Sequence, residues 1–307
     1  MTSVHQAVGA LLTVAALTLA GCASEGAEEK TPAVDRVLQE ARSVNQSRHV
    51  SESFDAHPVV LDDPDGFASA DLFFPTSEVL ILADDTPQAQ LRAASLAVVT
   101  HAPLIIYHSH QHAQVIREIE RMATHTVFAV GDVPVLGYTE QLKVIKDPGG
   151  LEALEKATAL RFEEAEVADP EQAVRAVASL NELEPTWLRA TYGPKQHISK
   201  DAKEDVVPVR SRQDAEMAPQ VIALPSTSIA SVATARAFGA NVYVTDEADP
   251  RQSHQTLVLT AGLSDKPLVA LGAFGSDQEL AARIKEAEGA IRPGDLNNIS
   301  SLPQSPD

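Results

Sequence analysis

The chain has 307 residues, of which 43 are acidic and 24 are basic, and its formal net charge is −19. No long segment carries a basic patch, which argues against nucleic acid as a partner and against bulk electrostatic binding to anionic lipid or polymer. The only cysteine is Cys22, so neither a disulfide framework nor a cysteine metal cluster explains its presence.

An unbroken small and apolar run extends from Leu11 to Ala20. About ten residues is typical of the hydrophobic core of a signal peptide, because a membrane-spanning helix needs roughly twenty. The run leads into the sequence LAGC, which ends at Cys22 and resembles the lipobox of bacterial lipoproteins. We therefore expect residues 1–21 to be a lipoprotein signal peptide and Cys22 to be lipidated. This would hold the protein on the extracytoplasmic face of the cell membrane. The alternative is a buried apolar helix that ends at Gly-Cys by chance.

Residues 22–75 are polar and dotted with proline, with one candidate helix, VDRVLQEARSV. We expect this segment to be mostly a flexible tether that follows the lipidated cysteine. The 285 residues after Cys22 (307 minus 22) contain no apolar stretch long enough to cross a membrane. They are enough for one large or two modest α/β units with a proper core.

The first α/β unit, with its extension, is expected over residues 76–192. The runs EVLILAD, PLIIYH and TVFAVG are typical of strands that are buried on both faces of a parallel sheet. Thr86-Pro87 marks the start of the first helix, in which Leu91, Ala94 and Val98 share one face. Further on, QLKVIKD and RFEEAEV are candidate strands around a helix near 151–159, and Asp169-Pro170 starts another helix.

Residues 193–219 are charged and contain proline, and we interpret them as an exposed acidic loop or linker. The second α/β unit is expected over 220–295, from the strands QVIALP, NVYVTD and KPLVALG and the helix TSIASVATARAFG. Asp249-Pro250 is expected to start the next helix, and Ser276 with Glu279 to cap the last. Residues 296–307 are expected to be a disordered tail.

The second unit repeats the first. The sequence ASLA at 94–97 matches ASVA at 230–233, and VFAVGD matches LVALGA, which places Gly131 opposite Gly272. The predicted fold class is therefore α/β, with parallel-sheet three-layer units in a degenerate internal repeat after a lipoprotein signal peptide.

The sequence from EVLILAD through APLIIYHS to VFAVGD resembles the cell wall-binding repeat 2 family. The resemblance is good over residues 76–140 and weaker over 220–291. It implies strand-helix units that pack together, usually three in tandem, and that bind an anionic wall polymer. The chain departs from the family pattern where Asp132 and Ala273 replace the second terminal glycine of each unit.

Four places in the sequence are candidate sites. His108, His110 and His112 follow a strand and are candidate zinc or copper ligands, and the alternative is a solvated turn that starts a helix. The sequence 272–276 precedes a helix and is either an anion cradle or a tight turn capped by Ser276. Residues 226–228 lie at a strand-to-helix turn, as a hydrolase nucleophile does, or they cap the helix. Asp84-Asp85 is either a cation or acid-base pair or an ordinary acidic turn.

None of these motifs forms a nucleophile-base set, so we expect a non-catalytic protein without cofactor or metal, and Cys22 as the one modified residue. The function that we infer is that of a surface-exposed lipoprotein that binds the cell envelope, with the membrane as one partner and cell-wall polymer as another candidate. The alternatives are a solute- or metal-binding lipoprotein with two lobes and, third, an envelope hydrolase.

Overall fold

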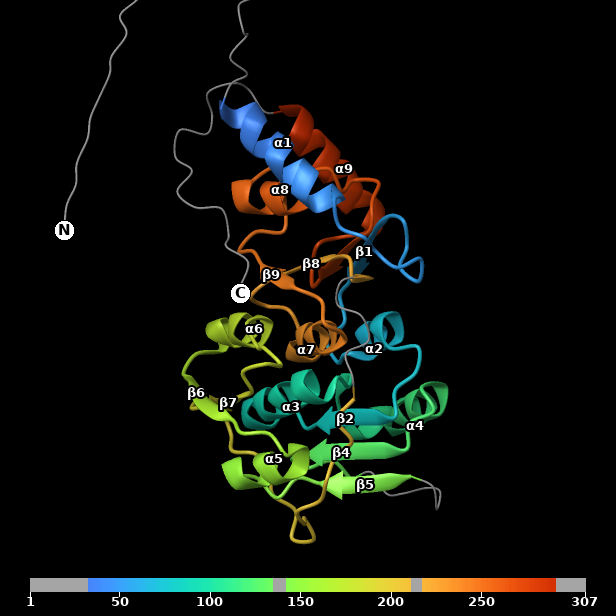
Figure 1. Ribbon diagram of the computed structural model, residues 1–307, viewed down its shortest axis with the longest axis vertical. Helices are drawn as coiled ribbons and strands as arrows, with labels where there is room; N and C mark the ends of the chain where they lie inside the picture. The colour runs from blue at the N-terminus through green and yellow to red at the C-terminus, as the bar shows by residue number, and fades with distance from the viewer. Residues whose placement is uncertain (1–32, 135–141, 211–216, 291–307) are drawn as a thin grey trace, which may run out of the picture. The chain divides into compact units, whose positions relative to one another are not determined.

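The computed structural model describes residues 33–134, 142–210 and 217–290 (Figure 1). Cys22, the predicted signal peptide and the predicted tail lie outside the described residues. Within the described ranges the chain is mixed α/β and its strands pair in parallel, which confirms the predicted fold class.

The first repeat builds one four-stranded sheet, in the spatial order β3-β2-β4-β5. Its strands are β2 (Val79–Ala83), β3 (Leu104–Ile106), β4 (Thr126–Val130) and β5 (Lys143–Lys146). Every residue of β2 and β4 is buried, so both faces of this sheet are covered, as the apolar runs predict. The strands are connected by α3 (Pro87–Thr100) and, after the short turn η1 (Ser109–Gln111), by α4 (His112–Arg121).

The second repeat builds a second four-stranded sheet, in the order β1-β10-β8-β9. Its strands are β1 (Pro58–Leu61), β8 (Gln220–Ala223), β9 (Val242–Val244) and β10 (Leu268–Leu271), and its helices are α7 (Ile229–Phe238), α8 (His254–Thr260) and α9 (Asp277–Ala290). The helix α8 begins four residues after Pro250, because Ser253 caps it and Asp249 instead binds Arg251. The predicted start at Asp249-Pro250 is therefore wrong.

The middle third forms a smaller unit. It contains α5 (Leu151–Thr158), β6 (Glu163–Val167), α6 (Pro170–Ala178) and β7 (Thr186–Ala190). The strands β6 and β7 pair in parallel, with Glu163 opposite Thr186. Asp169 caps α6 by accepting a hydrogen bond from the Glu171 amide, and Pro170 occupies the first helical position, as the sequence predicts.

Residues 33–75 are not the flexible tether that their polar sequence predicts. They form α1 (Ala33–Gln46), which confirms the candidate helix VDRVLQEARSV, together with the strand β1 and α2 (Phe67–Phe73). The helix α1 lies beside α8 and α9 (Figure 1), where Asn45 Nδ2 donates to the Ala261 carbonyl at 2.9 Å. The ring centroids of Phe54 and Phe73 lie 5.6 and 5.5 Å from that of Phe238. The prediction was wrong because the apolar runs of this segment, VVL at 59–61 and LFF at 72–74, are short and find their partners far along the chain.

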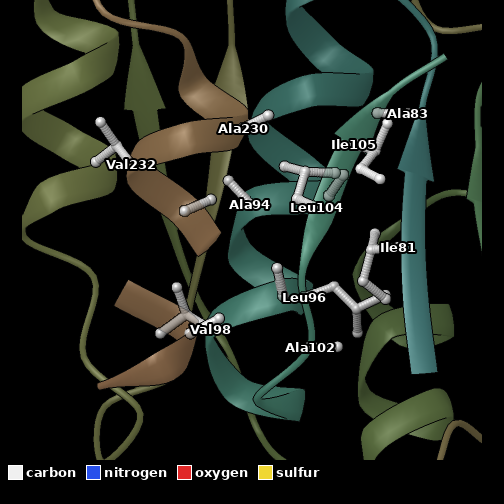
Figure 2. Close-up of a cluster of buried hydrophobic side chains, with 14 of the residues drawn as sticks. Ile81, Ala83, Ala94, Leu96, Val98, Ala102, Leu104, Ile105, Ala230 and Val232 are labelled. Atoms are coloured by element: carbon white, nitrogen blue, oxygen red, sulfur yellow. The ribbon is translucent and has the colours of Figure 1, made fainter. Parts of the chain in front are cut away.

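The helices α3 and α7 pack together in the core that the two repeats share. Figure 2 shows side chains of β2, β3, α3 and α7 in one cluster, among them Leu96, Leu104 and Val232. Alanines such as Ala94 and Ala230 are fully buried in it, and their small size lets the helix backbones approach closely. The sequence predicts one apolar face on α3, yet all residues from 91 to 100 are buried, because α7 and β7 cover the sides that the first sheet leaves open.

A buried ion pair fixes α3 to the turn after β5. The Arg92 guanidinium binds both Asp147 carboxylate oxygens, at 2.6 and 2.8 Å, and both side chains are almost fully buried. The guanidinium carbon also lies 5.1 Å from the centroid of the Trp187 ring. Two charges in the interior are tolerated because their geometry is bidentate and further donors bind the carboxylate.

The repeat is also visible in the glycines that follow β4 and β10. Gly131 and Gly272 occupy equivalent places, as predicted, with φ of 87° and 106°. A Cβ at Gly131 would lie 2.1 Å from Asp84 Oδ2, and one at Gly272 would lie 2.6 Å from Thr227 Oγ1. In each repeat, glycine makes room for the polar side chain that closes the neighbouring turn.

Candidate functional site

A cleft of about 530 Å³ lies where α3, α6 and α7 begin. Pro87, Pro170 and Ile229 are the first residues of these helices, and all three line the cleft. The carboxyl ends of parallel strands are where α/β folds commonly bind ligands. The cleft lies at such ends, because it is also lined by Asp85 just after β2, His108 just after β3 and residues that follow β7 and β8. The full lining is Pro64, Asp65, Asp85, Pro87, Gln90, Ile106, His108, Pro170, Ala173, Val174, Tyr192, Pro225, Thr227, Ser228 and Ile229.

One side of the cleft is formed by the loop after β1. Asp65 in this loop accepts a hydrogen bond from Gln111 Nε2 at 2.6 Å, and its Oδ1 atom lies 3.2 Å from His108 Nε2. The loop lies along the open edge of β3, where the Ile106 amide donates to the Asp65 carbonyl. Gly66 makes this close approach possible, because a Cβ there would lie 2.5 Å from the Leu104 carbonyl oxygen. The N-terminal segment thereby places a carboxylate beside the histidine of the first repeat.

The predicted carboxylate pair is split between two roles. Asp84 is buried, and its carboxylate accepts hydrogen bonds from the Thr86 amide and hydroxyl and from the Asp132 amide, at 2.6–2.9 Å. It closes the turn between β2 and α3 and ties this turn to the residues that follow β4. Asp85 is exposed and lines the cleft. The two carboxylates therefore do not face a common site. The structure favours an acidic turn over a pair that binds a cation or acts as acid and base.

The residues Ser226, Thr227 and Ser228 do not cap α7, which corrects the helix-capping interpretation. Ser228 occupies the cap position without a side-chain cap bond, and its hydroxyl donates to the Pro64 carbonyl at 2.7 Å. The Thr227 hydroxyl donates to the Leu271 carbonyl and accepts from the Leu224 amide. These hydroxyls tie the turn to its neighbours, and the first amides of α7 receive no side-chain cap.

The sequence 272–276 forms the predicted tight turn. Ser276 Oγ accepts from the Glu279 amide and Glu279 Oε2 accepts from the Ser276 amide, which is a complete capping box. The same interaction lowers the pKa of Glu279, through the Ser276 amide and hydroxyl and then the Arg283 charge.

The three histidines lie in the turn η1 and at the start of α4, as the solvated-turn interpretation predicts. The rings of His108 and His110 stack with their centroids 5.6 Å apart, whereas His112 Nδ1 lies 3.2 Å from the Tyr107 hydroxyl. Within the described ranges, no group of three or more His, Cys, Asp or Glu side chains is arranged to hold a metal ion.

Two residues that line the cleft, Asp65 and Tyr192, were not predicted from the sequence. Burial, with a smaller contribution from Asp169, raises the pKa of Tyr192, so its hydroxyl stays protonated and able to donate at neutral pH. PVVLDDP at 58–64 repeats the pattern of VLILADDTP at 79–87, a short apolar strand followed by two aspartates and a proline, but Asp65 itself lies one residue beyond this pattern.

No family model and no curated protein matches the chain. Among solved structures, the chain is similar to the crystal structure of CmiS6, at 11% sequence identity and a TM-score of 0.21. The match covers 75% of this chain and 59% of that one, which is less than two thirds of that chain's length. We infer neither fold nor function from it. In the described part of the chain, no helix is long and apolar enough to cross a membrane.

Proposed function

We propose that the chain is a lipid-anchored protein of the bacterial cell surface, which binds an envelope ligand without transforming it. The observation that carries the proposal is the cleft at the starts of α3, α6 and α7. Its size is typical of small-ligand sites, and it combines apolar walls with a few polar side chains.

The organisation of the chain supports a place in the envelope. The sequence LAGC at Cys22 resembles a lipobox, and the repeats resemble wall-binding repeats, which usually occur as three packed units. Three strand-helix-strand units are present here, namely β2-α3-β3, β6-α6-β7 and β8-α7-β9. Their helices meet at the cleft. The shared core between α3 and α7 does not favour the alternative of two lobes that close on a solute.

The anchor is tested by cell fractionation of wild type and Cys22→Ala in a bacterial host. We expect the wild type in the membrane fraction, because two or more acyl chains, at about 0.8 kcal/mol per buried methylene, anchor stably where one does not. The variant should be released or remain unprocessed. If the variant is processed to the mature size and still sediments with membranes as the wild type does, lipidation is the wrong explanation.

Binding is tested by co-sedimentation of the full chain, in detergent, with insoluble envelope material. Gln90→Trp places an indole in the cleft and should abolish co-sedimentation. The matched control is Gln172→Trp, on an exposed position of α6 outside the cleft. Equal loss in both variants, or in neither, would contradict binding through the cleft.

A hydrolase is a second candidate, because Asp65, His108 and Ser228 all line the cleft. The His108-Asp65 contact at 3.2 Å is the base-orienting half of a serine triad, and the uncapped start of α7 offers amides for an oxyanion. The Ser228 hydroxyl donates to a backbone carbonyl, however, so its proton is not directed at the imidazole. Covalent labelling by a fluorophosphonate that is lost in Ser228→Ala would favour this candidate over the binding protein.

A further inference from the structure

The charge of the cleft limits which ligand it can accept. Its lining contains two carboxylates, Asp65 and Asp85, and neither lysine nor arginine. The chain as a whole carries a formal charge of −19. An anionic ligand would therefore be repelled both on approach and in the bound state, since like charges brought together oppose binding.

The walls of the cleft suit a flat and partly apolar ligand. The ring of Tyr192 is half-buried at one side, and Val174 and Ile229 add aliphatic surface. Pro87 and Pro170 hold the starts of two helices with a fixed φ. These walls are rigid before any ligand arrives, so little conformational entropy is lost on binding.

The polar groups around these walls match a set of hydroxyls. Asp65 is held in place by Gln111 and His108, and an ionised carboxylate has more acceptor sites than these two contacts use. In the described part of the chain, no side chain pairs with the Asp85 carboxylate. The hydroxyl of Tyr192, which lines the cleft, adds a donor, because a phenol is protonated at neutral pH.

From this combination we infer that the cleft binds a hydroxyl-rich saccharide that carries no negative charge. The C–H face of a sugar ring would lie on Tyr192 and the aliphatic wall, and its hydroxyls would donate to Asp65 and Asp85. This inference rests on the proposed function and specifies its ligand class. It also departs from the anionic polymer that the family resemblance implies.

The test is isothermal titration of the full chain, in detergent, with three probes. The first is the N-acetylglucosamine tetramer, which is neutral. The second is its deacetylated counterpart, which has the same rings with cationic amines. The third is polyglycerol phosphate, which is anionic. Because the cleft is acidic, we expect both tetramers to bind more tightly than polyglycerol phosphate.

Three variants locate the binding. Tyr192→Ala and Asp85→Ala should each weaken binding of the neutral tetramer by roughly tenfold or more, because stacking and desolvated hydrogen bonds are lost. The matched control is Asp265→Ala, an exposed aspartate outside the cleft that changes the net charge equally and should leave binding unchanged. Equal binding by all variants would overturn the assignment to this cleft.

The remaining outcomes separate the ligand class from the function beneath it. If polyglycerol phosphate binds best and loses affinity in Tyr192→Ala, the saccharide inference is wrong and the binding cleft stands. If no probe binds and envelope co-sedimentation is also insensitive to Gln90→Trp, both the inference and the proposed function fail.

Discussion

Gly131→Ala is expected to destabilise the protein strongly, because two costs add at this position. An alanine at φ 87° costs about 1–2 kcal/mol in backbone strain. Its Cβ would also lie 2.1 Å from Asp84 Oδ2, so the buried carboxylate must move away from the Asp132 amide that it binds at 2.7 Å. Loss of that charge-assisted bond adds about 1.5–3 kcal/mol, for a total of roughly 2.5–5 kcal/mol. Urea unfolding followed by the fluorescence of Trp187, the only tryptophan, measures this directly.

The contribution of Asp84 is isolated by a double-mutant cycle. In an Asp84→Ala background the added Cβ no longer meets a carboxylate, so Gly131→Ala should cost only the strain of about 1–2 kcal/mol. Gly150→Ala introduces strain at a positive φ without a clash, because Gly150 has a φ of 80° and open space around its added Cβ. An equal cost of Gly131→Ala in the two backgrounds would refute the reasoning.

Three further predictions concern charge and metal. Arg92→Met should cost about 3–5 kcal/mol of unfolding free energy, because it leaves Asp147 buried without its partner. The double variant with Asp147→Leu should cost less than Arg92→Met alone. Urea unfolding of both variants tests this, and a double variant that costs more would contradict it. Metal analysis of the purified protein should find no stoichiometric zinc or copper, and one ion per chain that is lost in His110→Ala would disprove the solvated turn. Hydrogen bonds from Arg251 hold the pKa of Asp249 below its ordinary 3.8, so this carboxylate stabilises the fold above that pH and the stabilisation is lost as the pH falls further. The difference in unfolding free energy between wild type and Asp249→Asn should therefore shrink on acidification, and a constant difference would count against the ion pair.

The elements of the two repeats could be predicted from sequence, because each strand is a continuous apolar run and several helix starts carry a clear cap. Thr86, for example, accepts a hydrogen bond from the Ala89 amide, as the Thr-Pro start predicts. The strand β1 was missed because four residues, PVVL, are too short to show a periodicity. The full burial of α3 was also missed, since which sides of a helix are covered depends on partners as distant as α7.

The candidate site was predicted only in fragments. The His108 turn, Asp85 and Ser228 were each singled out, but nothing local indicates that they line one cleft. Their proximity depends on the packing of α3 against α7 and on the loop that brings Asp65 to the edge of β3. Both are contacts between residues that are far apart in sequence, which periodicity and capping patterns do not report.

The pairing of β1 with β10 has a consequence for the order of folding. Pro58 lies opposite Leu268, so this edge of the second sheet forms only after more than 200 further residues of the chain have been made. The first sheet, whose strands lie within residues 79–146, can assemble much earlier. Because non-local pairing is slow, we expect a late intermediate with the first sheet formed and the N-terminal strand still free. The loop that carries Asp65 follows that strand, so the cleft would be completed in the same last step.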